Sequence, residues 1–368
     1  MRHQETHFAA GHGWSAAFQQ ADQHLAALGL VHAGRQWLHQ VSGGMAQRVG
    51  IACASQSDAR LLIADEPTKG LDAGACEQVA QLLASAQHQG QALLTITHDL
   101  DLALRLGGQV AVMRQGRIVE AGEVARVLSA PQHAYTRELI AAQPRHWPSL
   151  SSTHRTVASD PVIAAEQVSV RFGERAVLQG ACLPVAEGES VAVVGPSGCG
   201  KTTLGNVLVG ALTPRQGTVR RRTGVPAWRF QKLYQDPVAS FPPQQTLRRG
   251  ITDLLRLHRL DPSPLHHWLQ RLRLNDELLD RRPGEVSGGE LQRLAILRAM
   301  LLQPVFVFAD EPTSRLDALT QRETMAALCE AMAESGCAML LVSHDPDLAR
   351  NATHRQWRVE NGQLLAAT

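Results

Sequence analysis

A block of short motifs occurs twice in this chain, with a nearly constant separation. Three motifs return in the same order: Ser42-Gly43-Gly44 as Ser287-Gly288-Gly289, Asp65-Glu66 as Asp310-Glu311, and His98-Asp99 as His344-Asp345. The separation is 245 residues for the first two pairs and 246 for the third. A fixed offset over several landmarks indicates two copies of one domain. The chain is therefore expected to fold as two related units.

The second copy also contains a glycine-rich loop that fits the pattern GxxxxGK[ST]. The loop follows the apolar segment 190–194 and precedes the helical segment 203–212, which is the context that a phosphate-binding loop requires. Backbone N–H groups of such a loop surround phosphate oxygens, and the helix N-terminus favours negative charge. We expect Lys201 to reach the β- and γ-phosphates of a nucleotide and Thr202 to hold Mg²⁺. The loop residues are Gly195, Pro196, Ser197, Gly198, Cys199, Gly200, Lys201, Thr202 and Thr203.

The first copy lacks a counterpart of this loop. Subtracting the offset from Gly195 gives a position before residue 1, so we interpret the second copy as complete and the first as partial. We expect a truncated form of a protein with two full copies. The alternative is a first copy that has become a shortened helper domain.

The order of predicted elements indicates an α/β fold with a mainly parallel sheet. Apolar strands at 60–65, 92–96, 305–309 and 338–343 alternate with helical segments, as in βαβ units. A polar stretch with prolines and serines at 143–160 is the predicted linker. The predicted domains are therefore 1–142 and 161–368.

Acidic pairs end two of these strands, and the second pair lies in the complete copy. Asp310 follows the apolar run 305–309, at the strand end where ligands of parallel sheets collect. We expect it to bind Mg²⁺, while the adjacent Glu311 acts as general base on a water molecule.

Both Ser-Gly-Gly motifs precede helices. Each offers a hydroxyl, exposed backbone N–H groups and a helix dipole to an anion. A single such motif is usually an ordinary helix cap. Two copies, each at the same distance before an Asp-Glu pair, favour anion binding by Ser42, Gly43, Gly44, Ser287, Gly288 and Gly289.

Composition limits the cellular setting. The formal net charge is +2 and charged residues make up 19% of the chain, so no nucleic-acid partner is expected. No apolar run approaches the roughly 20 residues of a membrane helix. The six cysteines form no CxxC pair, which favours reduced thiols in a cytosolic protein.

These motifs together resemble the ATPase subunits of ABC transporters. The resemblance covers nearly all of residues 15–368 and implies a P-loop fold with a helical signature subdomain and an antiparallel β-subdomain. It implies ATP and Mg²⁺ as ligands, Asp310 and Thr202 as metal-binding residues, and Glu311 as the catalytic glutamate. His344 is similar to the switch histidine. Gln235 resembles the Q-loop glutamine, which contacts Mg²⁺, and Phe172 the aromatic residue that stacks on adenine.

The sub-type rests on two further stretches. Residues 132–144, QHAYTRELIAAQP, and 234–243, YQDPVASFPP, are similar to ATPases of oligopeptide, dipeptide and nickel importers. The resemblance implies permease subunits in the membrane, a solute-binding protein, a place on the cytoplasmic face of the inner membrane, and a second ATPase chain as an option. For 133–139, HAYTREL, the alternative is the start of an amphipathic helix.

Because ATP in this family is held between a phosphate loop and a signature motif of another domain, we expect one composite ATP site. Lys201 and its neighbours would face Ser42, Gly43 and Gly44, leaving the second signature without a partner loop in this chain. Two other functions stay open: a non-transport ABC ATPase that acts on ribosomes or DNA, and an inactive regulatory remnant.

Overall fold

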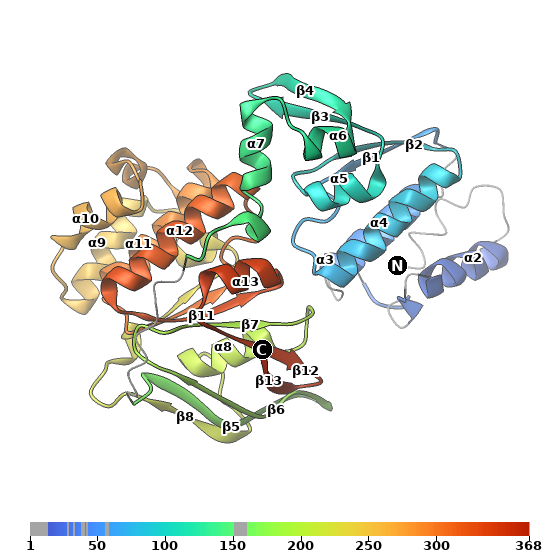
Figure 1. Ribbon diagram of the computed structural model, residues 1–368. Helices are drawn as coiled ribbons and strands as arrows, with labels where there is room; N and C mark the ends of the chain where they lie inside the picture. Colours follow the sequence, from blue (N-terminus) through green and yellow to red (C-terminus); the bar gives the residue numbers. More distant parts are fainter. Residues whose placement is uncertain are drawn as a thin grey trace. The chain divides into compact units, whose positions relative to one another are not determined.

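The computed structural model describes residues 14–27, 29–31, 34–37, 41, 43–55, 59–150 and 160–367 (Figure 1). The chain divides into two compact units, Met1–Ile140 and Ala141–Thr368. Each unit combines helices with parallel and antiparallel strands, in agreement with the α/β class predicted from the sequence.

The first unit contains a parallel pair of strands joined by a helix. β1 (Leu61–Asp65) and β2 (Ala92–Ile96) pair in parallel, and α4 (Ala73–His88) connects them. One side of the pair is buried: Leu62 and Ala64 pack with Val79 and Leu83 of α4. α3 (Gly43–Ser55) precedes β1 and packs beside α4, and α5 (Leu100–Leu106) follows β2.

The remaining elements of this unit are a helix, a hairpin and two short helices. α2 (Trp14–Ala27) precedes the first signature motif, whereas 34–37 is not helical and 1–13 lies outside the described residues. β3 (Gln109–Arg114) and β4 (Arg117–Glu123) form an antiparallel hairpin. Its turn residues Gln115 and Gly116 have φ of 51° and 75°, the conformation that two-residue hairpin loops favour. α6 (Val124–Ser129) and α7 (Ala134–Ala141) follow.

A six-stranded sheet forms the centre of the second unit. Its strand order is β13-β12-β7-β11-β10-β9, and all neighbours are parallel except β12 and β13. β7, β10 and β11 are buried at every position, as expected for interior parallel strands. The strands are β7 (Ser190–Val194), β9 (Phe230–Leu233), β10 (Phe306–Asp310), β11 (Ala338–Ser343), β12 (Arg355–Glu360) and β13 (Gln363–Ala367).

α8 (Lys201–Val209) contacts this sheet and a second, antiparallel sheet (Figure 1). The antiparallel sheet consists of β5 (Ile163–Phe172), β6 (Arg175–Val185) and β8 (Gln216–Arg221). Gly205 of α8 lies directly on the ring of Phe308, and a Cβ at Gly205 would lie 2.2 Å from that ring. The absence of a side chain therefore lets α8 approach β10.

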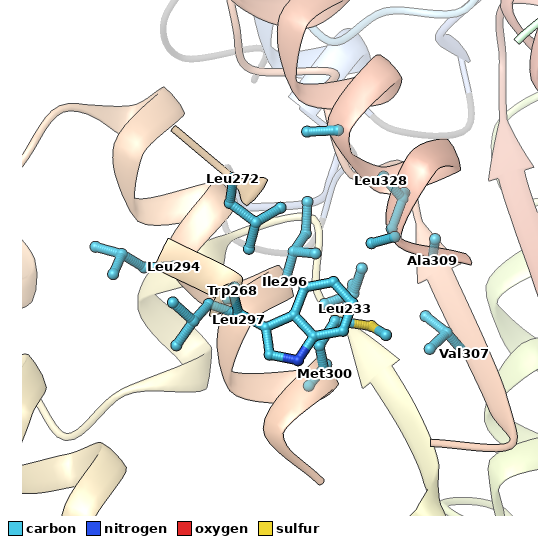
Figure 2. Close-up of a cluster of buried hydrophobic side chains, with 14 of the residues drawn as sticks. Leu233, Trp268, Leu272, Leu294, Ile296, Leu297, Met300, Val307, Ala309 and Leu328 are labelled. Atoms are coloured by element: carbon cyan, nitrogen blue, oxygen red, sulfur yellow. The ribbon is translucent and has the colours of Figure 1, made fainter. Parts of the chain in front are cut away.

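Helices cover another part of the sheet through a large apolar core. Figure 2 shows Trp268, Leu272, Leu297 and Met300 among the side chains of this core. The helices are α9 (Leu247–His258), α10 (Pro264–Arg271), α11 (Gly288–Leu301), α12 (Ala318–Ser335) and α13 (Pro346–Ala352).

The first half of the predicted linker belongs to the second unit instead. Residues 144–146 form a short 3₁₀ helix, and Trp147 is buried with its indole N–H bonded to the Ala142 carbonyl at 2.8 Å. Asn351 of α13 donates to the Pro144 carbonyl at 2.8 Å. A buried tryptophan with its N–H satisfied explains why this polar stretch is held in place. Residues 151–159 lie outside the described part of the chain.

Among the described residues, no helix has both the length and the apolar character needed to cross a membrane.

Candidate functional site

The glycine-rich loop connects β7 to α8 at the carboxyl edge of the central sheet. β7 has parallel neighbours on both sides, β11 and β12, so its end is rigidly placed. Gly200, the residue before α8, has φ of 115°, and a Cβ there would lie 3.0 Å from the Val177 carbonyl. Only glycine adopts this backbone without strain and clash. The first turn of α8 therefore directs its free N–H groups toward the loop.

Lys201 closes this loop from the inside. Its Nζ donates to the carbonyl oxygens of Gly195 at 2.7 Å and Pro196 at 2.9 Å, and the residue is 5% exposed. The ammonium group is therefore held at the centre of the loop, where it can exchange these carbonyls for phosphate oxygens. Of the other predicted loop residues, Ser197, Gly198 and Cys199 lie in the turn itself, whereas Thr203 lies in the first turn of α8.

Thr202 and Asp310 are brought together across the sheet edge. Thr202 lies in the first turn of α8 and donates its hydroxyl to Oδ1 of Asp310 at 2.8 Å. Asp310 ends β10, as predicted. Lys232 of β9, which belongs to none of the sequence motifs, lies 3.2 Å from Asp310 Oδ2.

Glu311 follows in a left-handed backbone conformation. Its φ is 47°, and its amide donates to the Val342 carbonyl at 2.9 Å. A residue other than glycine held there costs roughly 1–3 kcal/mol, which is typical of functional sites. The turn directs the Glu311 side chain away from Asp310, so the two neighbouring acids reach different partners.

His344 and Gln235 both contact the Glu311 carboxylate. His344 Nδ1 lies 3.4 Å from Oε2, and the Gln235 amide donates to the same oxygen at 3.1 Å. Gln235 also donates to the Ser314 hydroxyl at 3.3 Å. Burial alone would lower the pKa of His344, but the hydrogen bond and charge of Glu311, with Asp345, outweigh it and raise this pKa above its ordinary value.

The oxygen donors fit a magnesium ion in part. The Thr202 hydroxyl and the Asp310 carboxylate are hard oxygen ligands 2.8 Å apart, and Mg²⁺ in nucleotide sites uses one or two such groups with phosphates and water. Gln235, which was also predicted to contact Mg²⁺, has its amide bonded to Glu311 and Ser314 instead. We therefore place it beside the predicted base.

Phe172 lies at the end of β5 with 55% of its surface exposed. Arg175, the first residue of β6 and the cross-strand partner of Phe172, donates to the Gly198 carbonyl of the phosphate loop at 3.0 Å. An exposed aromatic ring near this loop is available to stack on a base. Arg175 was not predicted, because no motif marks it.

The signature motif of the second unit forms a helix cap. Ser287 is the N-cap of α11, and its hydroxyl donates to the Glu290 carboxylate at 2.6 Å while Glu290 also accepts from the Ser287 amide. These bonds lower the pKa of Glu290. Gly288 begins the helix, and a Cβ at Gly289 would lie 2.2 Å from Thr320 of α12. The motif is thus also a close helix contact.

Of the first signature, Gly43 begins α3, and a Cβ at Gly44 would lie 3.0 Å from the Leu71 side chain. Ser42 lies outside the described residues. The first copy has the same histidine–glutamate contact as the second: His98 Nδ1 lies 2.7 Å from Glu66 Oε2.

The stretch 132–140 forms the start of α7 and binds the hairpin of its own unit. Glu120 of β4 accepts from the amides of Gln132 at 2.8 Å and His133 at 3.1 Å. Arg114 of β3 lies over the Tyr135 ring, 4.9 Å from its centre. Tyr135 and the backbone of this stretch therefore hold it against the hairpin, whatever the stretch indicates about the type of transporter.

Comparison with known proteins agrees with these motifs. The family model described as ABC transporter matches residues 2–69 and 178–314. The chain is 36% identical over 335 residues to the peptidoglycan transport ATP-binding protein YejF of Agrobacterium fabrum, covering 83% of this chain and 61% of the relative. It is 33% identical over 377 residues to the glutathione import ATP-binding protein GsiA of Escherichia coli, covering 89% and 60%. The chain thus spans about three fifths of the length of these relatives.

Solved structures show the same fold. The archaeal ribosome recycling factor aABCE1 superposes with a TM-score of 0.65 over 94% of this chain and 67% of that chain, at 22% identity. The protein cbiO1 of Clostridium perfringens, part of an ABC transporter complex, superposes with a TM-score of 0.51 over 56% of this chain and 88% of that chain, also at 22% identity. At such identities the likeness concerns the fold.

Proposed function

This chain belongs to the ABC transporter family, and on that basis we propose that it binds and hydrolyses ATP to drive import across a membrane. The observation that carries this proposal is the arrangement in the second unit, where a closed phosphate loop, the Thr202–Asp310 pair and the Glu311–His344 pair meet at one sheet edge. This is the set of groups that phosphoryl transfer to water needs.

Each residue has a distinct part in the proposed reaction. Lys201 exchanges its two carbonyl partners for the β- and γ-phosphate oxygens, and the N–H groups of the loop bind the same oxygens. Thr202 and Asp310 would hold Mg²⁺, which would supply positive charge to these phosphates. Glu311 accepts a proton from the attacking water as general base. His344 and Gln235 orient the Glu311 carboxylate.

From the motif spacing alone, we also propose that Ser42, Gly43 and Gly44 contribute donors to a bound nucleotide. Ser287, Gly288 and Gly289 would do so for a second ATPase chain. Permease subunits and a solute-binding protein would complete the transporter, with this chain peripheral on the cytoplasmic face of the membrane.

For the cargo we propose peptide-containing solutes. The relatives are named for glutathione import and for peptidoglycan transport, and both molecules contain peptide portions. This agrees with the oligopeptide and dipeptide resemblance of residues 132–144. Nickel or metal chelates are the alternative cargo.

The direct test of the ATPase is nucleotide binding and phosphate release by the purified full chain. We expect Lys201→Ala to lose tight ATP binding, because it removes the ammonium group at the centre of the loop. Binding that survives in Lys201→Ala would show that the site is assigned wrongly.

A tagged chain tests the transport role separately. We expect it to co-purify with membrane permease subunits. Co-sedimentation with ribosomes in their place would favour the non-transport alternative.

A further inference from the structure

Lys232 places a charged side chain inside an apolar part of the second unit. It lies on β9 between buried Phe230 and Leu233, and its side chain is only 15% exposed. β9 pairs with β10 so that Lys232 is opposite Phe308. Asp310 is two residues beyond Phe308 on the same face of β10, within reach of a lysine side chain.

Two polar groups and two rings surround the ammonium group. Nζ lies 3.2 Å from Asp310 Oδ2 and donates to Asn206 Oδ1 at 2.9 Å. The ring centres of Tyr234 and Phe308 lie 4.9 Å and 5.0 Å away. A carboxylate partner and aromatic ring faces are favourable surroundings for a side-chain ammonium group.

The two oxygens of Asp310 therefore have different partners. Oδ1 accepts from Thr202, the predicted magnesium-binding hydroxyl, while Oδ2 faces Lys232. The lysine fixes the rotation of the carboxylate and offsets its negative charge. Without it, Asp310 would oppose the entry of the polyanion ATP unless a metal ion came with it, because like charges repel strongly in a poorly hydrated site.

We propose that Lys232 is a built-in counter-ion of the Asp310 carboxylate. It is a positioning residue that lets ATP bind with less dependence on Mg²⁺. The inference rests on the proposed ATP site and adds a residue that the motifs do not include. It concerns nucleotide binding, so it can be tested without measuring hydrolysis.

The test compares ATP affinity of the full chain in Mg²⁺ with that in EDTA, by calorimetric titration. Lys232→Met keeps the apolar contacts but removes the charge. We expect the ratio of the Kd in EDTA to the Kd in Mg²⁺ to rise about tenfold, which corresponds to about 1.4 kcal/mol. The rise should come mainly from weaker binding in EDTA. Lys232→Arg should keep the ratio of the unaltered chain.

Asn206→Ala is the matched control, because it removes the other partner of Lys232 and leaves both charges. We expect its ratio to be unchanged. If Asn206→Ala raises the ratio as much as Lys232→Met, packing is responsible and the proposal is wrong. If Lys232→Met does not fold, Lys232→Gln replaces it with the same expectation.

Two further outcomes separate this inference from the proposed function. A folded Lys232→Met chain with an unaltered ratio overturns the inference and leaves the ATP site intact. Failure of the unaltered chain to bind ATP in either buffer overturns the proposed function, and this inference with it.

Discussion

The acidic strand ends of the two units are alike, although only one unit has a phosphate loop. Glu66 and Glu311 both have φ of 47°. The Glu66 amide donates to the Ile96 carbonyl at 2.8 Å and the Glu311 amide to the Val342 carbonyl at 2.9 Å. Each carboxylate lies beside the histidine that follows the neighbouring parallel strand. Strand pairing and turn geometry are therefore sufficient for this arrangement.

One face of these equivalent strands is exposed in the first unit and buried in the second. In the first unit, four alternating side chains are about half exposed: Leu61, Ile63, Leu94 and Ile96. Their counterparts in the second unit are 0% exposed: Phe306, Phe308, Leu340 and Val342. α8 and the antiparallel sheet cover the second set. Local geometry is thus kept without the covering layer, whereas burial depends on it.

The strongest test of this difference is truncation at equivalent positions. Phe308→Ala removes a buried ring that packs on Gly205, so we expect a loss of about 4 kcal/mol in the free energy of unfolding. Ile63→Ala, 245 residues earlier, should cost less than about 1 kcal/mol because Ile63 is 59% exposed. Chemical denaturation of both variants measures these costs. Equal losses would mean that the two faces are equally buried in solution.

The next test concerns the two acids. Glu311→Gln removes the proposed base beside the phosphate loop, and we expect the ATP turnover rate to fall at least about a hundredfold. Glu66→Gln removes the equivalent acid of the unit that has no such loop, and should change turnover less than about twofold. Phosphate release at saturating ATP measures both. A large loss in Glu66→Gln would show that the first unit takes part in hydrolysis.

A smaller effect is expected at two helix glycines. Gly205→Ala puts a methyl group against the Phe308 ring, and such overpacking costs about 1–3 kcal/mol. Gly50→Ala in α3 is the control, because a Cβ there meets nothing within 4 Å and the helix should gain about 0.5–1 kcal/mol. Melting temperatures should shift in opposite directions. A rise in Gly205→Ala would mean that α8 is not in close contact with β10.

The smallest effect is on pH dependence. Because the pKa of His344 is raised above the ordinary histidine value of about 6.5 by the Glu311 carboxylate, its protonated form stabilises the folded second unit. That stabilisation is complete below about pH 6.5 and is lost as pH rises through the raised pKa. The destabilisation caused by His344→Gln should therefore shrink between pH 6 and pH 9 in urea titrations. A difference that stays constant over this range would contradict the raised pKa.

Most of the second unit could be predicted from sequence, because its motifs are local. The strand, loop and helix around Lys201 are continuous in the chain, and Asp310 directly follows an apolar run. The offset between copies also located β1, β2 and the Glu66–His98 pair.

Lys232, Glu290 and the packing of Trp147 could not be predicted in this way. The role of Lys232 depends on the register between β9 and β10, which the sequence does not contain as a motif. Glu290 closes a capping box that competes with the predicted anion contact of Ser287. Trp147 lies in a stretch whose polar composition predicts a linker. A tryptophan among prolines and serines nevertheless indicates that the stretch packs against a folded unit.

The hydrogen bonds of Lys201 also affect the heat of nucleotide binding. The ammonium group already donates to the carbonyl oxygens of Gly195 and Pro196. Phosphate oxygens must replace these acceptors, so binding exchanges hydrogen bonds instead of adding them. The lysine should therefore contribute little to the binding enthalpy, and its value lies in a side chain whose conformational entropy has already been lost in the folded protein.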